Sequence, residues 1–295
     1  MRVGDCDIAE TFAEAFKMWG ARVVITADSP KWALAAARSM TGFATSIIGC
    51  KCEAGIEADI PPGETPDGRP GIAVLLFAMD APGVAKRLIE RIGQCVMTCP
   101  TTSCFNGLTA DKRVSVGGKL RYFGDGYQIS KRLDGRHYWR IPVMDGEFLV
   151  EDRFGVQPGV GGGNLLILGR DRSAALAAAE AATEAMGQVP GVILPFPDGV
   201  VRSGSKIGSR YKALIASTND AYCPSLRGFS PDSALPDEVG AVVEIVIDGL
   251  SLEAVEAAMG AGLQAAAGAG ALQISAGNYG GKLGQFHIKL HDLLA

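Results

Sequence analysis

A glutamate inside an apolar run is the residue of this sequence best suited to acid–base chemistry. Glu244 lies within Ala241–Asp248, whose other residues are mostly Val and Ile. The alternation predicts a strand with Glu244 on the same face as Val242 and Val246. A carboxylate among apolar neighbours loses solvation, which raises its pKa unless a cation pairs with it. Glu244 is therefore either a general acid/base or one half of a buried ion pair with Lys or Arg.

Three glycine-rich loops could accept an anionic small molecule, namely Gly161–Asn164, Ser203–Lys206 and Gly277–Gly284. Glycine lets the backbone approach a ligand, and Lys206 and Lys282 would match a negative group. None of the loops has the spacing of a P-loop or of a dinucleotide-binding motif. Each alone is equally typical of a tight turn, but together they predict a cleft for a large anionic molecule.

A further loop combines hydroxyl and amide groups. In Cys99–Thr102, and in Asn106 shortly after it, these groups could hold a carbonyl oxygen or cap a helix and a turn. The 7 cysteines are odd in number and match no zinc or iron–sulfur spacing, so we expect reduced thiols. His287 and His291 lie in an alternating segment without a carboxylate pattern, and no metal site is predicted.

The elements that must position these residues recur in the two halves of the chain. Each half has a β-branched strand, an N-cap, an alanine-rich helix and a second strand. In the first half these are Val23–Thr26, Ser29, Trp32–Arg38 and Ser46–Ile48; in the second half they are Leu165–Leu168, Asp171, Ala174–Glu180 and Gly191–Leu194.

The later parts of the halves correspond as well. Each has a strand, a helix and a loop with Asn and Gly: Ala73–Asp80, Val84–Met97 and Phe105–Gly107, then Ala241–Asp248, Leu252–Ala267 and Asn278–Gly280. In this alignment Leu76 corresponds to Glu244. The first copy of the repeat therefore manages without the carboxylate, which favours a functional role for it.

This order predicts an α+β fold of two fused ferredoxin-like βαββαβ lobes related by internal duplication. Turn residues gather in Met144–Glu147 and Pro158–Gly163, so the predicted lobes are residues 1–150 and 151–295. The aromatic segment Lys119–Arg140 is an insertion in the N-terminal lobe, expected to form hairpin strands with a satellite core.

Composition excludes several classes of protein. The chain has 295 residues, 47% of them hydrophobic and 20% charged, with a net charge of -4. No basic excess exists, so nucleic-acid binding is not expected. The sequence has no apolar stretch of membrane-spanning length and no signal peptide, and we expect a cytoplasmic protein without membrane contact.

Motifs along the whole chain resemble the formylmethanofuran:tetrahydromethanopterin formyltransferase family. In the first half they are Asp7–Phe16, Ala21–Ala27, Thr41–Ser46, Glu53–Glu57, Glu64–Gly71, Glu90–Gln94 and Pro100–Thr102. The second half adds Pro195–Pro197, Ser203–Lys206, Ala216–Asn219 and Ala276–Gly284. So many long motifs in one order are far more specific than any single glycine loop.

The resemblance implies a function and an assembly. The family transfers a formyl group between the amine of methanofuran and N5 of tetrahydromethanopterin, without a metal or prosthetic group. Its members form homotetramers with active sites at a subunit interface, and some are subunits of a formyltransferase/hydrolase complex. Glu244 falls in the strand of the family's proposed catalytic glutamate. The expected substrate-binding residues are Thr102, Asn106, Ser205, Lys206, Asn278, Tyr279 and Lys282.

A second hypothesis is a non-catalytic ferredoxin-like module that binds a ligand or serves as a scaffold subunit of a one-carbon-converting complex, because fold alone does not fix function. A mid-strand carboxylate that breaks the repeat, as Glu244 does, argues against it.

Overall fold

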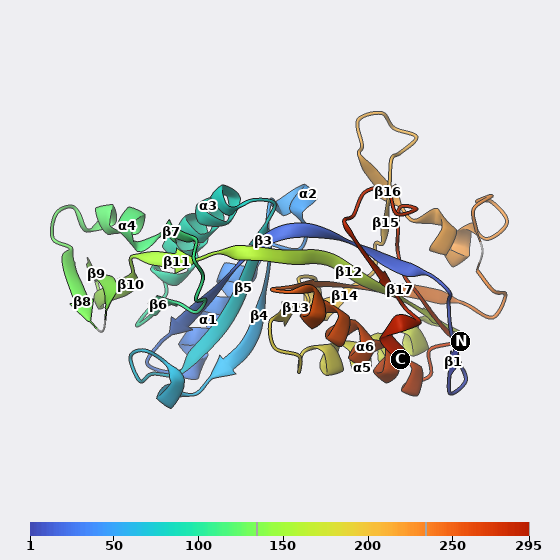
Figure 1. The fold of residues 1–295 in the computed structure, drawn as a ribbon, viewed down its shortest axis with the longest axis horizontal. Helices are drawn as coiled ribbons and strands as arrows, with labels where there is room; N and C mark the ends of the chain where they lie inside the picture. The colour runs from blue at the N-terminus through green and yellow to red at the C-terminus, as the bar shows by residue number, and fades with distance from the viewer. Residues whose placement is uncertain (134, 234, 295) are drawn as a thin grey trace. The chain divides into compact units, whose positions relative to one another are not determined.

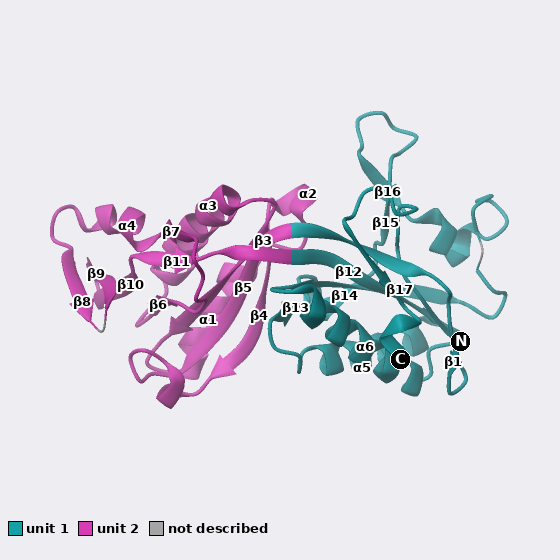
Figure 2. Ribbon diagram, viewed as in Figure 1, with its two compact units in different colours: residues 1–17, 160–295 teal, residues 18–159 magenta. Residues whose placement is uncertain are grey.

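The computed structural model describes residues 1–133, 135–233 and 235–294, which form a mixed α+β fold with a large sheet (Figure 1). The chain divides into two compact units (Figure 2). Unit 1 comprises residues 1–17 and 160–295, and unit 2 comprises residues 18–159. Strands β3 (Phe12–Thr26) and β12 (Gln157–Gly169) each contribute residues to both units.

Unit 2 is built on four antiparallel strands in the order β4–β5–β3–β6. The added strands are β4 (Glu53–Ile60), β5 (Gly71–Ala78) and β6 (Ser103–Asn106). Helix α1 (Pro30–Thr41) follows β3, and α3 (Ala81–Arg91) follows β5 and continues into the π-helical turn η2 (Ile92–Val96). Both helices pack on the sheet face that carries Val23, Ile25 and Val74.

The rest of unit 2 consists of short elements. They are α2 (Ile47–Cys50), η1 (Pro62–Glu64), β7 (Arg113–Ser115), α4 (Gly117–Leu120), η3 (Arg121–Gly124), β8 (Ile129–Leu133), β9 (Arg136–Val143), β10 (Gly146–Glu151) and β11 (Arg153–Gly155). Strands β8 and β9 form the hairpin predicted in the aromatic segment. Tyr138 and Trp139 are buried there, whereas Tyr122, Phe123 and Tyr127 are exposed.

Unit 1 repeats the arrangement around β12. Its sheet order is β13 and β14, then β17, β12 and β18, all antiparallel to their neighbours. The bounds are β13 (Val192–Ile193), β14 (Val200–Val201), β17 (Ala241–Gly249) and β18 (Gln273–Ser275). Helices α5 (Arg172–Met186) and α6 (Leu252–Gly268) pack together on the face that carries Leu165, Ile245 and Ile247.

The chain termini complete unit 1. Strand β1 (Arg2–Val3) pairs with β2 (Cys6–Ile8), β2 with β18, and β19 (Phe286–Lys289) with the first residues of β3. The remaining elements are η4 (Pro197–Gly199), β15 (Ser205–Ile207), β16 (Ala216–Thr218), η5 (Asp220–Tyr222), η6 (Pro224–Leu226) and η7 (Asp292–Leu294). No helix in the described residues is long and apolar enough to cross a membrane.

Several predicted elements are confirmed. The strands in β3, β5, β12 and β17, the helices α1, α5 and α6 and the N-cap at Asp171 all form, and the Asp171 carboxylate accepts a hydrogen bond from the backbone N–H of Ala174. The segment predicted from alternation at Phe286 is strand β19. The predicted helix Val84–Met97 is instead divided into α3 and the π-helical turn.

Other predictions were wrong. Ser46–Ile48 is not a strand, because Ser46 accepts a hydrogen bond from the Ile48 N–H and begins α2. Phe105 and Asn106 lie in β6 rather than in a loop. The run Pro158–Gly163 belongs to β12, not to a turn. Its glycines permit close packing, since a Cβ at Gly163 would lie 2.6 Å from a methyl of Val255.

The alignment of Leu76 with Glu244 was also wrong, because the two repeats were aligned out of register along this strand. Glu244 pairs with Leu166, on the sheet face away from the helices, whereas Leu76 packs with α1 and α3. The two repeats can be aligned on their helix N-caps, Ser29 and Asp171. Leu166 and Val24 then correspond, because each lies five residues before its cap. Val24 pairs with Ala73 of β5. The first copy therefore has alanine where the second has Glu244.

Candidate active site

Glu244 lies in the middle of β17, between Leu166 of β12 and Val201 of β14. Its side chain is half-buried, and within the described residues no hydrogen bond or ion pair reaches the carboxylate. Burial raises the pKa of Glu244 from an ordinary 4.5 to about 7. The group can therefore accept and return a proton near neutral pH.

A close approach of the backbone at Gly204 keeps space around this carboxylate. A Cβ at Gly204 would lie 3.1 Å from Oε2 of Glu244. The two residues line a cavity of about 40 Å³, which exceeds the roughly 15 Å³ that one water needs. The cavity is lined by Leu166, Val201, Arg202, Gly204, Thr218, Asn219, Tyr222, Cys223, Val242, Val243 and Glu244.

The predicted ligand residues Ser205 and Lys206 lie on β15, directly after Gly204. The Lys206 ammonium forms an ion pair with Asp220, whose pKa is lowered by Lys206 and by a hydrogen bond from Ser230. Lys206 also lines a larger cavity of about 700 Å³ together with Arg210. These basic groups thus line a space large enough for a coenzyme.

The loop Asn278–Gly284 lies beside the start of β3. The Asn278 amide donates to the Thr11 hydroxyl at 3.1 Å and to the Phe12 carbonyl at 3.2 Å. Burial raises the pKa of Tyr279, and the negative charges of Glu244 and Glu14 raise it further. Tyr279 therefore lies in the electrostatic field of Glu244, whereas Lys282 is exposed.

The predicted residues Thr102 and Asn106 belong to unit 2 and bond to the backbone. The Thr102 hydroxyl donates to the carbonyls of Val96 at 2.6 Å and Cys99 at 3.0 Å. The Asn106 side-chain oxygen accepts from the Gly155 N–H at 2.8 Å. These bonds match the capping alternative for both residues.

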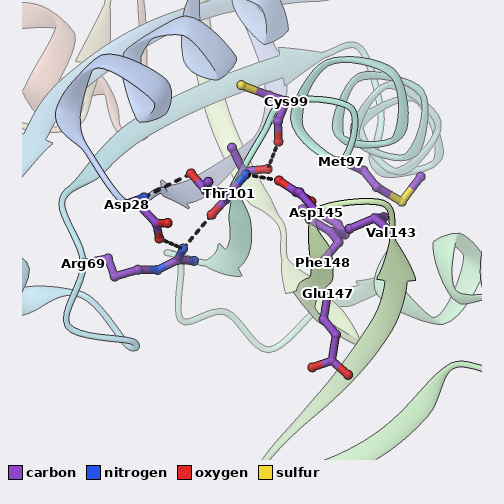
Figure 3. Close-up of a pocket in the computed structure, with 10 residues that line it drawn as sticks. Asp28, Arg69, Met97, Cys99, Thr101, Val143, Asp145, Glu147 and Phe148 are labelled. Carbon is purple, nitrogen blue, oxygen red and sulfur yellow. Dashed lines mark hydrogen bonds and ion pairs between the residues drawn. The ribbon is translucent and has the colours of Figure 1, made fainter.

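A polar cavity of about 170 Å³ lies beside Thr102 (Figure 3). Arg69 donates to Asp28 at 2.9 Å and to the Thr101 carbonyl at 2.5 Å, while Asp145 accepts the Thr101 N–H at 2.8 Å. Thr101 has φ of 65°, a left-handed conformation that is unfavourable for a β-branched residue. The two charged side chains hold the loop in this shape.

No metal-binding group of three or more His, Cys, Asp and Glu occurs in residues 1–133, 135–233 and 235–294. The His287 ring lies tilted at 43° to that of Phe12, with ring centroids 5.0 Å apart. The His291 ring bonds to the Ile8 carbonyl oxygen at 2.9 Å. All seven cysteines are free thiols.

Comparison with known families covers nearly the whole chain. Residues 1–143 match the family model of formylmethanofuran-tetrahydromethanopterin formyltransferase, and residues 146–293 match the model of its proximal lobe. The chain belongs to this formyltransferase family.

Relatives of known structure agree closely with this formyltransferase-family fold. The formyltransferase/hydrolase complex of Methylorubrum extorquens, solved with methylofuran, contains a chain with a TM-score of 0.97 and 52% identity, covering 100% of this chain and 99% of that one. The formyltransferase of Methanosarcina barkeri gives a TM-score of 0.95 and 48% identity, covering 99% and 100%. Among relatives compared by sequence alone, the formylmethanofuran--tetrahydromethanopterin formyltransferase of Methylococcus capsulatus is 57% identical over 100% of both chains.

Two residues with many polar contacts in this formyltransferase-family chain, Glu14 and Arg69, were not predicted from the sequence. Glu14 is buried and accepts backbone N–H groups of the Asn278–Gly284 loop. Its signal was present, because Phe12–Phe16 alternates apolar residues around a carboxylate just as β17 does. Arg69 gave no such signal, since its partners come from distant parts of the chain.

Proposed function

We propose that this protein catalyses reversible transfer of a formyl group between the amine of methanofuran and N5 of tetrahydromethanopterin. The observation that carries the proposal is Glu244, a half-buried carboxylate with a pKa of about 7 and an open cavity beside it. Membership of the formyltransferase family supplies the reaction. A scaffold has no need of a carboxylate kept without a partner.

Transfer between two nitrogens passes through a tetrahedral intermediate. N5 attacks the formyl carbon, the carbonyl oxygen becomes an oxyanion, and N5 must lose a proton. We infer that the Glu244 carboxylate accepts this proton and then, as a carboxylic acid, donates it to the departing methanofuran amine. The new C–N bond forms when N5 attacks, the old C–N bond breaks when the intermediate collapses and the carbonyl re-forms, and Glu244 ends in its starting state.

The basic and polar loops of unit 1 are proposed to bind the coenzymes. Lys206, which forms an ion pair with Asp220, and exposed Lys282 are proposed to bind anionic groups, and Ser205, Asn278 and Tyr279 are proposed to line the site. In unit 2 we propose that Thr102 and Asn106 shape substrate-binding loops of that unit through their backbone bonds.

The proposal also covers the division of the chain into lobes and its assembly with other subunits. The strand orders β4–β5–β3–β6 and β14–β17–β12–β18 each match a ferredoxin-like βαββαβ unit. We propose that residues 1–150 and 151–295 are duplicated lobes, that the chain forms a homotetramer, and that it works without a metal or prosthetic group. The relative in the methylofuran-bound complex supports association with hydrolase subunits.

The test compares wild type with Glu244→Gln in a spectrophotometric formyl-transfer assay. We expect activity in wild type and a fall in kcat of roughly 100-fold or more in the variant. The control is Glu180→Gln on α5, an exposed glutamate whose loss should leave turnover unchanged. Near-normal turnover in folded Glu244→Gln would remove Glu244 from the reaction, and inactive wild type of correct assembly would favour the binding-module hypothesis.

A further inference from the structure

A fully buried carboxylate of unit 1, that of Glu14, has no part in the reaction described so far. Glu14 lies on β3 between Ala13 and Ala15, and is 1% exposed. Within the described residues no Lys, Arg or His forms an ion pair with it. A buried charge is costly unless hydrogen bonds satisfy it, so its partners define its role.

Both oxygens of Glu14 accept backbone N–H groups from one loop. Oε2 accepts from Tyr279 at 2.7 Å and from Gly281 at 3.0 Å. Oε1 accepts from Leu283 and Gly284, each at 2.5 Å. Four N–H groups of the segment 279–284 therefore converge on a single carboxylate, an arrangement of backbone donors that suits an anion.

The glycines of the loop make this convergence possible. Gly280 and Gly281 have φ of 69° and 71°, which is the left-handed region that glycine adopts without strain. A Cβ at Gly284 would lie 2.5 Å from the Ala15 carbonyl oxygen and 2.6 Å from Cγ of Glu14. The loop sequence thus fits the carboxylate on β3, which gives Gly280, Gly281 and Gly284 a structural reason.

The charge state of Glu14 follows from these contacts. Burial alone would raise its pKa, but the four backbone N–H groups lower it below the ordinary value. Glu14 is therefore ionised under the conditions in which Glu244 exchanges a proton. A neutral side chain could not accept four N–H groups at once.

The loop connects Glu14 to the reaction through two side chains. Tyr279, whose N–H is bound, lies in the field of Glu244, and its ring packs near Phe16 with centroids 6.1 Å apart. Lys282 stands between Gly281 and Leu283, whose N–H groups are both bound. A shift of the loop would therefore move both side chains.

We propose that Glu14 is a positioning residue of the formyl transfer, an ionised template that holds the 279–284 loop so that Tyr279 keeps its place beside Phe16 and Lys282 meets an anionic coenzyme. The inference rests on the proposed function. Glu14 itself touches no reacting atom, and it acts through the backbone.

The test combines kinetics with hydrogen exchange on the full-length protein. In Glu14→Gln an amide nitrogen replaces one acceptor oxygen and faces two N–H donors. We expect amide exchange in residues 279–284 to rise at least about tenfold while that of α5 is unchanged. We expect kcat to fall roughly 10–100-fold, with a higher KM for the coenzyme that Lys282 binds. Glu14→Asp keeps the charge and both oxygens, and should show intermediate exchange and activity.

The control is Glu10→Gln, an exposed glutamate of the same N-terminal segment, which should match wild type in both measurements. Unchanged loop exchange in folded Glu14→Gln, or faster exchange with unchanged kinetics, would overturn the positioning role. Should Glu14→Gln fail to fold, Glu14→Asp decides by the same two criteria. An inactive wild type would contradict the proposed function. The amide exchange of residues 279–284 would still show whether Glu14 holds the loop, because exchange is measured without substrate.

Discussion

Glu14 and Glu244 are carboxylates of the same unit in opposite environments. Glu14 is surrounded by N–H donors, which keep its pKa low, whereas Glu244 has lost solvent without gaining a partner in the described residues, and its pKa is about 7. One side chain is thus suited to hold structure and the other to move protons. This division follows from hydrogen bonding rather than from depth of burial.

The raised pKa of Glu244 predicts a stability cost. Between the ordinary pKa of 4.5 and the folded value of about 7, the folded state keeps a proton that the unfolded state releases. Stability is therefore greatest below about pH 4.5 for this group, decreases as pH rises to about 7, and is lower by on the order of 3 kcal/mol above it. Glu244→Gln, which never ionises, should exceed wild type in stability by about that amount at pH 8.

Urea unfolding of both proteins at pH 5 and pH 8 measures this difference. The gain from Glu244→Gln should be large at pH 8 and small at pH 5. An equal gain at both values would mean that Glu244 titrates normally. A more stable but inactive variant would match the trade-off between stability and function expected at catalytic sites.

Gly204→Ala tests the space beside Glu244. The new Cβ would lie 3.1 Å from Oε2, so the carboxylate must move by a few tenths of an ångström. Because φ of Gly204 is not positive, alanine fits the backbone and the fold should be retained. We expect kcat to fall about tenfold with an unchanged melting temperature. Wild-type kcat would show that the position of the carboxylate is not critical.

At the scale of elements, long periodic segments were predicted well and short ones were not. The β-branched runs that became β12 and β17 pack on both faces, so burial and propensity agree. Ser46–Ile48 also contains β-branched residues, but the hydrogen bond from the Ile48 N–H to the Ser46 hydroxyl caps a helix, and the segment forms the start of α2. Pro158–Gly163 has the glycines of a turn, yet it is part of β12, where Gly163 is required by close packing against Val255 of α6.

Helix packing in unit 1 gives a matched pair of predictions. A Cβ at Gly262 of α6 would lie 2.0 Å from Cε of Met186 on α5, whereas nothing lies within 4 Å of one at Gly268. Gly262→Ala should destabilise the protein by about 1–3 kcal/mol through overpacking. Gly268→Ala should stabilise it by up to about 1 kcal/mol through helix propensity. Denaturant unfolding measures both, and equal effects would contradict the packing argument.

At the scale of the whole molecule, the sequence predicted the α+β class and the repeat but not the partners of the site residues. Glu244 was found because a strand pattern makes a carboxylate conspicuous. The pairing of Lys206 with Asp220, and the bonds of Arg69 to Asp28 and the Thr101 carbonyl, depend on how distant segments meet. No local pattern encodes such contacts.

The composition of unit 1 leads to a prediction about chain order. Residues 1–17 supply Cys6, Ile8, Ala13 and Ala15 to its core, pair with β18 and β19, and carry Glu14. A fragment of residues 160–295 therefore lacks strands β1 and β2, the start of β3, part of its core and the acceptor of four N–H groups. We expect this fragment to be unfolded or molten, because each of those losses is destabilising.

Joining residues 1–17 after residue 295 should restore the fold. Both termini belong to unit 1, and a flexible Gly/Ser linker of about ten residues adds only a small closure entropy. Near-ultraviolet circular dichroism and a cooperative thermal transition should appear in the permuted fragment and be absent from the linear one. The same permuted fragment with Glu14→Gln should melt at lower temperature, because the loop loses its acceptor. A linear 160–295 fragment that melts cooperatively would show instead that the C-terminal repeat is a self-sufficient lobe and that the N-terminal strands only cover it.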